Sequence, residues 1–291
     1  MTTFVANQRA VSGAPVVLRW QPTDSEGEPS AVAGTVTVEV ARSDGSEVLA
    51  AGTATTAVGS ARTVTVPAPE ALVTDVLSAT WSVDGDVYAV TTCEVVGGVY
   101  ASVDQIRALE PSLADVGKYP TADVQAARAE VESMFEDAAK RAFVPRFRVD
   151  TLRCEGSWDL VVRRPDVRSV RWATVADWRG VETTVDVSSV QVAPNGVLRR
   201  GSQPWPAGTL TIGYEYGLAF PPADLLRAIV TAVRLRLNTA KSAIPDRAVS
   251  FTQIEGGTVT LATPGTYGWI TGAPEVDEAL KRYRWHEVGV A

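Results

Sequence analysis

The sequence predicts an α+β protein, in which an N-terminal all-β sandwich of immunoglobulin-like type precedes a helical core with an inserted β region. Three observations predict this order. Short β-branched runs separated by turn residues fill the first hundred positions, Gly97-Gly98 marks an abrupt change to helical periodicity, and strand-like runs then return between two helices. We therefore expect two domains, at residues 1–97 and 98–291.

The first domain is predicted from short runs rich in valine and threonine. They lie at 16–20, 35–40, 63–66, 76–83 and 87–95. Apolar and polar residues alternate clearly in 35–40, and Asp84-Gly85 forms a two-residue turn signal between the last two runs. Six or so short strands in under a hundred residues favour a sandwich, but the Cys-Trp-Cys spacing of immunoglobulin domains is missing, so the strand order stays open.

Four helices are expected in the second domain. They are predicted at about 102–110, 121–143, 222–238 and 274–284. Ser102 and Gln105 form a capping-box pattern at the first start, and apolar residues recur at helical spacing in the longer segments. The last helix is too short to be stable alone, so it must pack on its own domain or on a neighbouring subunit.

Strands return between the second and third helices, in an inserted β region at about 147–217. The predicted strands are 148–154, 159–162, 167–175, 183–192 and 209–216. Pro194-Asn195-Gly196 is expected to form a turn.

The net negative charge of the chain comes from the first domain. Residues 1–100 contain 4 Lys+Arg and 11 Asp+Glu, whereas residues 101–291 contain 23 of each, so the net charge of −7 belongs to the first hundred residues. This asymmetry indicates two modules with different neighbours. The start of the chain lacks a signal-peptide pattern and no run reaches the roughly 18–20 apolar residues of a membrane span, so we expect the protein to stay where it is made, without membrane contact.

Residue types that carry chemistry are sparse. Cys93 and Cys154 are far apart and are expected to be buried thiols, and His286 is the only histidine and lies near the end of the chain. Neighbouring carboxylates such as Asp84/Asp86 and Glu130/Glu132 fit turns and opposite helix sides better than acid–base pairs. Walker, Rossmann and nucleophile-elbow motifs are missing. We therefore expect no catalytic residue, cofactor or metal, and no enzyme activity.

A stripe of arginines runs through the inserted β region, interleaved with tryptophans. It includes Arg163, Arg164, Arg168 and Arg171, with Trp158, Trp172 and Trp178 nearby. Such a stripe fits sequence-independent phosphate binding, which would make these four arginines DNA contacts. Acidic residues are interspersed, so solvated strand faces or subunit interfaces are the favoured interpretation.

A long segment rich in Gly, Thr and Pro, at 244–271, connects the last two helices. Within it, Val259 and Leu261 alternate with polar residues and could add a strand to the sheet edge of a partner. An intrachain hairpin that turns at Gly256-Gly257 or Pro264-Gly265 is the equal alternative.

Four stretches together resemble the head-to-tail adaptor (head-tail connector) family of long-tailed bacteriophages, in the versions found in actinobacteriophages. These stretches are Glu94–Tyr100 leading into Val103–Arg107, Tyr214–Gly217 followed by Pro221–Leu225, the loop Gly256–Ala262, and Thr271–Leu280 running into Arg282–Arg284. Each is weak alone, but their order and spacing cover residues 94–291 and form a fairly specific set.

The resemblance implies a structural virion protein of the neck, made in the host cytoplasm. It implies a dodecameric ring between the portal protein and a stopper or tail-completion protein, through which double-stranded DNA passes. The C-terminal residues 274–291 are implied as the portal-docking segment, and residues 1–97 as an outward-facing accessory module. Our candidates for the portal or subunit interface are Arg227, Arg234, Thr258, Val259, Leu261, Arg282, Tyr283, Arg284 and Trp285.

Two rival functions remain open beside the adaptor. The sandwich could recognise a carbohydrate or host surface in an adhesion protein, which would remain a monomer with glycan affinity. A hydrolase would need two carboxylates converging about 5–10 Å apart, and no spacing in the sequence indicates such a pair.

Overall fold

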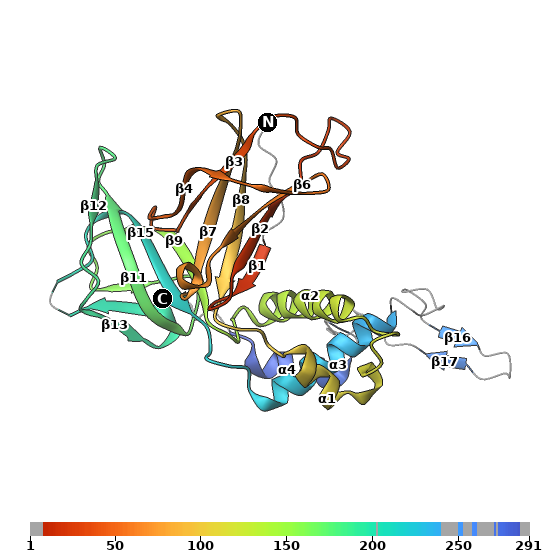
Figure 1. Ribbon diagram of the computed structural model, residues 1–291. Helices are drawn as coiled ribbons and strands as arrows, with labels where there is room; N and C mark the ends of the chain where they lie inside the picture. Colours follow the sequence, from red (N-terminus) through yellow and green to blue (C-terminus); the bar gives the residue numbers. More distant parts are fainter. Residues whose placement is uncertain are drawn as a thin grey trace. The chain divides into compact units, whose positions relative to one another are not determined.

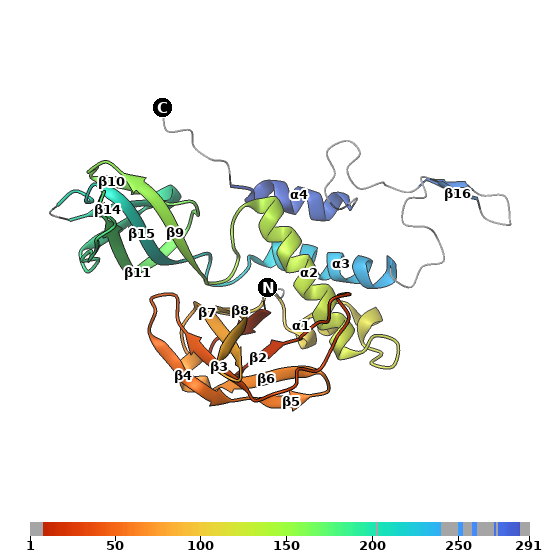
Figure 2. The ribbon, with the colours of Figure 1, turned by 90° about the horizontal axis from the view of Figure 1, so that it is seen from above.

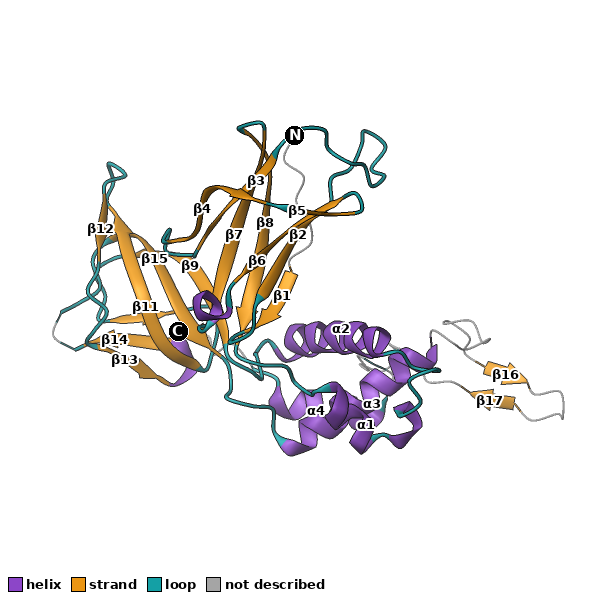
Figure 3. Cartoon of the chain, viewed as in Figure 1, coloured by secondary structure: helices purple, strands orange, loops and turns teal. Residues whose placement is uncertain are grey.

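The computed structural model of the chain describes residues 8–201, 203–239, 250–252, 258–260, 271 and 273–285. The chain divides into two compact units (Figure 1). The first unit contains the residues up to Gly98 together with Val144–Ala219, and the second contains Val99–Phe143 together with the residues from Phe220 onward. Strands form the first unit and the α-helices gather in the second (Figure 3). The predicted α+β class, with a helical part interrupted by a β region, is therefore confirmed.

The N-terminal part of the first unit is a two-sheet sandwich (Figure 2). One sheet has the order β1-β8-β7-β3-β4 and the other β2-β6-β5. The strands are β1 (Gln8–Val11), β2 (Val16–Trp20), β3 (Val36–Ala41), β4 (Glu47–Ala54), β5 (Thr56–Val58), β6 (Ala61–Val66), β7 (Asp75–Val83) and β8 (Asp86–Val96), with a 3-10 turn, η1, at Ala68–Ala71. β2, β6 and β5 take the places of immunoglobulin strands B, E and D, and β3, β7 and β8 those of C, F and G.

The alternating residues of these strands form the sandwich core. Every second residue of β7 is buried, and Trp20 packs on Trp81 with ring centroids 5.9 Å apart. The indole N–H of Trp81 donates to the Thr91 hydroxyl at 2.9 Å, which satisfies the one polar atom of this fully buried ring. All five predicted strands are found. β1, β4 and β5 were not predicted, because alanine, glycine and exposed polar residues interrupt their pattern.

The turn between β7 and β8 follows the predicted Asp84-Gly85 signal. Asp84 and Gly85 have φ values of 52° and 96°, a left-handed pair typical of the tight hairpin turn. The Asp84 carboxylate accepts the backbone N–H of Thr35 at 2.8 Å, so the same residue also holds the start of the β3 segment. The carboxylate is therefore structural, as expected.

The inserted β region adds two more sheets to the first unit. They have the orders β12-β11-β15-β9 and β10-β14-β13. The strands are β9 (Arg146–Cys154), β10 (Asp159–Val161), β11 (Val167–Ala176), β12 (Glu182–Thr184), β13 (Val190–Ala193), β14 (Val197–Arg200) and β15 (Gly208–Tyr216), with a 3-10 turn, η3, at Pro194–Gly196. Trp205 is fully buried among them and donates its indole N–H to the Leu198 carbonyl at 3.1 Å.

The prediction of one strand over 183–192 is wrong. The structure has two strands there, β12 and β13, which belong to different sheets. The Asp186 carboxylate accepts the N–H of Ser188 at 2.9 Å and a turn joins Val190 N–H to the Val187 carbonyl, so the chain changes direction between the strands. β14 was not predicted, because its four residues include two arginines.

The second unit is built from four helices. They are α1 (Val103–Leu109), α2 (Thr121–Ala139), α3 (Ala223–Thr239) and α4 (Pro274–Tyr283), with a 3-10 turn, η2, at Pro111–Leu113. α3 packs against α2 and α4, and α1 contacts α2 and α3 (Figure 2). The capping box predicted at Ser102 and Gln105 is confirmed, with its two hydrogen bonds at 3.1 and 2.8 Å. α2 ends at Ala139 rather than at 143, because Lys140 takes a left-handed conformation with φ of 56°.

By packing, the inserted β region belongs with the N-terminal sandwich rather than with the helices. The change at Gly97-Gly98 coincides with a boundary between the units, but the first unit also takes in Val144–Ala219. The assignment of 1–97 as an accessory module and of 98–291 as an adaptor domain stays a prediction about function. Among the residues described, the structure has no helix long and apolar enough to cross a membrane.

Candidate interaction surfaces

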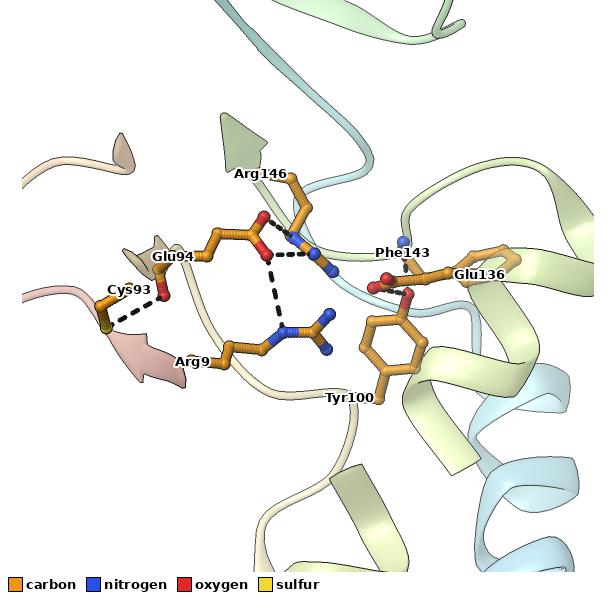
Figure 4. Close-up of polar contacts among 7 residues, drawn as sticks. All are labelled: Arg9, Cys93, Glu94, Tyr100, Glu136, Phe143 and Arg146. Atoms are coloured by element: carbon orange, nitrogen blue, oxygen red, sulfur yellow. Dashed lines mark hydrogen bonds and ion pairs between the residues drawn. The ribbon is translucent and has the colours of Figure 1, made fainter. Parts of the chain in front are cut away.

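Within the first unit, an ion pair of Glu94 connects the sandwich to the inserted β region (Figure 4). It lies on β8 and makes a two-point ion pair with Arg146 at the start of β9, a guanidinium that is almost fully buried. Arg9 on β1 approaches the same carboxylate at 3.7 Å. A buried arginine needs such a partner, so Glu94 has a structural role.

Gly97 is required by the close approach of Pro145 next to this ion pair. Its N–H donates to the Pro145 carbonyl at 2.8 Å, and a Cβ placed on Gly97 would lie 2.6 Å from the proline ring. Gly97, one residue of the stretch that carries part of the family resemblance, is thus explained by packing within the first unit.

Tyr100 holds the start of the second unit against helix α2 and the segment that follows it (Figure 4). Its hydroxyl donates to Glu136 at 2.7 Å and accepts the Phe143 N–H at 3.2 Å, while its own N–H donates to the buried Glu132 at 2.8 Å. Arg128, one turn earlier on α2, lies 3.5 Å from Glu132. The Glu130/Glu132 pair is therefore structural, as expected: Glu132 holds Tyr100, and Glu130 pairs with Arg236 of α3 at 2.5 Å.

Two of the four arginines proposed as DNA contacts are paired with one carboxylate. Arg168 and Arg171 lie 2.9 and 3.0 Å from Glu215, which also accepts the Thr74 hydroxyl of the sandwich at 3.1 Å. The Arg164 guanidinium lies over the Tyr216 ring at 5.9 Å, and Arg163 is exposed. The stripe is thus partly neutralised inside its own unit.

Asp150 is the most enclosed carboxylate of the inserted region, with 2% of its surface exposed. It accepts the Tyr214 hydroxyl and the Arg148 guanidinium, both at 2.6 Å, and the Arg163 N–H at 3.0 Å. Burial alone would raise the pKa of Asp150, but these hydrogen bonds outweigh it and hold the pKa below its usual value. Burial and the same contact raise the pKa of Tyr214, so the pair stays as phenol and carboxylate.

Helix α4 docks on its own unit through Asp224 in the first turn of α3. Arg282 and the Tyr283 hydroxyl each reach this carboxylate at 2.7 Å, and the hydrogen bond from Tyr283 lowers the pKa of Asp224. The Trp285 N–H donates to the Ala139 carbonyl at 2.8 Å. Of the four C-terminal residues predicted to face a partner, three therefore make contacts within the unit, and Arg284 is exposed.

Some of the predicted interface residues of α3 and of the long connecting segment make contacts within the chain, and others do not. Arg234 pairs with Glu110 at 2.9 Å, whereas Arg227 is exposed and forms no ion pair with any residue that the structure describes. β16 (Ser250–Thr252) and β17 (Thr258–Thr260) pair antiparallel, which agrees with the hairpin that includes Gly256-Gly257. Thr258 and Val259 lie on β17, and Leu261 and His286 lie outside the described residues.

Tryptophan exposure separates core residues from surface candidates. Trp20, Trp81 and Trp205 are buried, so they do not contribute to an interface. Trp178 is 85% exposed at the tip of the β11–β12 hairpin, and Trp158 is 55% exposed in the loop between β9 and β10. Both tryptophans belong to the arginine stripe predicted from the sequence. The signal for a hairpin tip at Trp178 was the Asp-Trp-Arg-Gly turn between two strand-like runs.

The two cysteines are buried and unpaired, as expected. Burial raises the pKa of the Cys93 thiol to about 11, so it is protonated at neutral pH. No group of three or more potential metal ligands occurs in the described part of the chain.

Comparisons with known proteins give only distant likenesses. The sequence matches no protein-family model and no curated protein. One solved structure, the neck of an empty gene transfer agent particle computed with C6 symmetry, contains a chain 15% identical with a TM-score of 0.44, covering 67% of this chain and 97% of that one. A chain of the native gene transfer agent virion is 18% identical with a TM-score of 0.37, covering 59% and 79%. TM-scores this low establish neither a shared fold nor a shared function.

Proposed function

We propose that the chain is a structural virion protein that forms a ring between the portal and the stopper or tail, where it extends the DNA channel and joins capsid to tail. One observation carries the proposal: a helical unit built from two chain segments, with a β region inserted between α2 and α3 and a β-hairpin between α3 and α4. The helical core with an inserted β region is what the family resemblance implies for an adaptor subunit.

The use of the charged residues supports a structural role. Glu94, Asp150 and Glu215 are each held by arginines, and each joins strands that are distant in sequence. A catalytic carboxylate needs access to a substrate, whereas these are committed to holding the fold. The exposed arginines and tryptophans belong to the residue types that dominate protein interfaces.

The portal-docking segment is refined by the contacts of α4. Arg282 and Tyr283 fix the helix to Asp224, so they position the segment, and the exposed Arg284 and Arg227 are the cations left for a partner. Because the sandwich supplies Glu94 and Thr74 to partners in the inserted β region, residues 1–97 brace that region in addition to their proposed accessory role.

In this proposal the four arginines of the inserted β region that were predicted as DNA contacts contribute little to DNA binding. Arg168 and Arg171 share Glu215, so one of their two positive charges is compensated before any phosphate approaches. Arg163 and Arg164 are the two of these four arginines whose guanidinium groups have no carboxylate partner among the described contacts.

Portal binding and assembly state test the proposal together. Purified chain should form multi-copy rings, alone or on the portal protein of the same virus, in negative-stain images and native mass spectra. Arg284→Glu should weaken capture by the portal, whereas Arg19→Glu, which reverses an exposed charge on β2, should not. A persistent monomer that the portal does not capture, with affinity for glycans, would favour the adhesion alternative instead.

A further inference from the structure

We propose that neighbouring copies of this chain meet through a knob and a hollow, with Trp178 and Arg179 of one copy inserted beside Glu155 of the next. Both surfaces belong to the inserted β region of the first unit. The inference deepens the proposed ring and rests on it only for closure, because the contact itself concerns two copies.

The knob is a turn whose shape does not depend on its tryptophan. The Asp177 carboxylate accepts the N–H groups of Arg179 and Val181 at 2.8 and 2.9 Å, and the Gly180 N–H donates to the Asp177 carbonyl at 3.0 Å. Gly180 has φ of 81°, a conformation that favours glycine. The turn is thus preorganised, while Trp178 contributes little to its fold.

The side chains on the knob are ordered and exposed. The Arg179 guanidinium stacks on the Trp178 ring at 4.5 Å, and Val181 beside them is 59% exposed. Stacking restrains the arginine before binding, so less side-chain entropy is lost when a partner arrives. Tryptophan and arginine are both enriched among interface hot spots.

The hollow lies where β9 ends and β10 begins, and it has a volume of about 350 Å³. Its lining includes the apolar side chains of Leu152, Leu160 and Val161, of which Val161 is 45% exposed, and the Cys154 thiol. The other lining residues are Arg153, Glu155, Ser157 and Asp159. This volume is near the lower end of the range of about 300–1,000 Å³ for pockets that bind compact groups, which suits one aromatic side chain.

Charge and topology favour a second copy as the occupant. Among the described residues Arg179 forms no ion pair, and neither do Glu155 and Arg153 at the hollow, so the Arg179 guanidinium of one copy can pair with the Glu155 carboxylate of the next. The register Ala176↔Thr209↔Arg153 puts the ends of β11 and β9 at the same end of the sheet. β15 separates the two strands, and no described hydrogen bond or ion pair joins the tip to the hollow of its own chain.

Such a contact is heterologous, because a different surface is used on each side. Every copy then carries both a knob and a hollow, and repeated contacts form a ring when the rotation closes.

A charge-swap cycle with a tryptophan truncation tests the contact. Trp178→Ala should weaken self-association about 30-fold, as expected for a hot spot, by sedimentation velocity and native mass spectrometry of the full chain. The matched control is Tyr88→Ala, which removes an aromatic side chain that is 55% exposed on the sandwich, and it should associate like the wild type. Arg179→Glu and Glu155→Arg should each weaken association, and the double variant should recover it.

The possible outcomes separate this inference from the proposed function. If Trp178→Ala assembles like the wild type, or the double swap is no better than the sum of the single changes, the contact is wrong and the adaptor proposal stands. If the chain assembles through Trp178 but the portal never captures it, the contact stands and the adaptor role fails. A wild type that never forms multi-copy complexes, alone or with portal, contradicts both.

Discussion

The interior of the inserted β region and its hairpin tip use the same residue types in opposite ways. Inside, Trp205 is fully buried with its N–H bonded, and Arg148 is held by Asp150. At the tip, Trp178 is 85% exposed and the Arg179 guanidinium contacts only the Trp178 ring among the described partners. Residue type alone therefore does not identify an interface. Whether a side chain is buried, and whether its polar atoms already have partners within the chain, distinguishes a core residue from a candidate interface residue.

The largest difference between the two regions should appear in stability. Trp205→Ala removes a buried ring and leaves a cavity, so we expect a loss of about 3–5 kcal/mol in the free energy of unfolding. Chemical denaturation followed by fluorescence measures it. A loss below about 1 kcal/mol would mean that Trp205 does not form the centre of this core.

The second-largest loss of unfolding free energy should follow substitution of the buried carboxylate, Asp150. Asp150→Asn leaves Arg148 and Tyr214 without their charged acceptor; because the Arg148 side chain is 32% exposed, we expect a loss of about 2–3 kcal/mol, below the full cost of a broken buried pair. The exposed Asp159, paired with Arg199, is the control, and Asp159→Asn should have little effect.

The same carboxylate predicts the direction of a pH effect. The pKa of Asp150 is lower in the folded protein than the value of about 3.9 expected in the unfolded chain, so its stabilisation is complete above that value and is lost as the pH falls through the lower, folded pKa. Thermal unfolding between neutral pH and about pH 3 should therefore show less acid destabilisation for Asp150→Asn than for the wild type. Equal slopes would contradict the assignment.

Gly97→Ala should have a smaller effect, set by packing. The new Cβ would meet the Pro145 ring at 2.6 Å, and crowding of this kind costs about 1–3 kcal/mol. Gly98→Ala is the matched control, because nothing lies within 4 Å of its Cβ position. Equal melting temperatures for the two variants would show that the chain there adjusts freely.

The smallest change in stability should come from the tip. Trp178→Ala is expected to keep the unfolding free energy within about 0.5 kcal/mol of the wild type, because its turn is held by Asp177. A larger loss would make Trp178 a structural residue and remove the contrast between the two regions.

Sequence patterns predicted the elements whose side chains decide the structure locally. The alternating strands of the sandwich, the Asp84-Gly85 turn and the Ser102 capping box were all found, since each depends on residues close in sequence. The split between β12 and β13 and the end of α2 at Ala139 were missed, because Asp186 and Lys140 stop these elements through local conformations that the apolar pattern does not record.

The interaction surfaces were less predictable than the fold. Arg168, Arg171, Arg282 and Tyr283 were singled out by type, but their partners Glu215 and Asp224 are 44 to 59 positions away in the chain. Composition cannot show which arginine has found a carboxylate. The tip at Trp178 and the hollow beside Glu155 emerged only once burial and contacts were known.

The central claim is that this chain works as one of many identical subunits in a virion neck. Imaging of the wild-type chain mixed with the portal protein of the same virus tests it most directly. The account predicts closed rings of this chain stacked on the portal, with neighbouring copies in contact. Single unassembled subunits, with the portal bare, would contradict it.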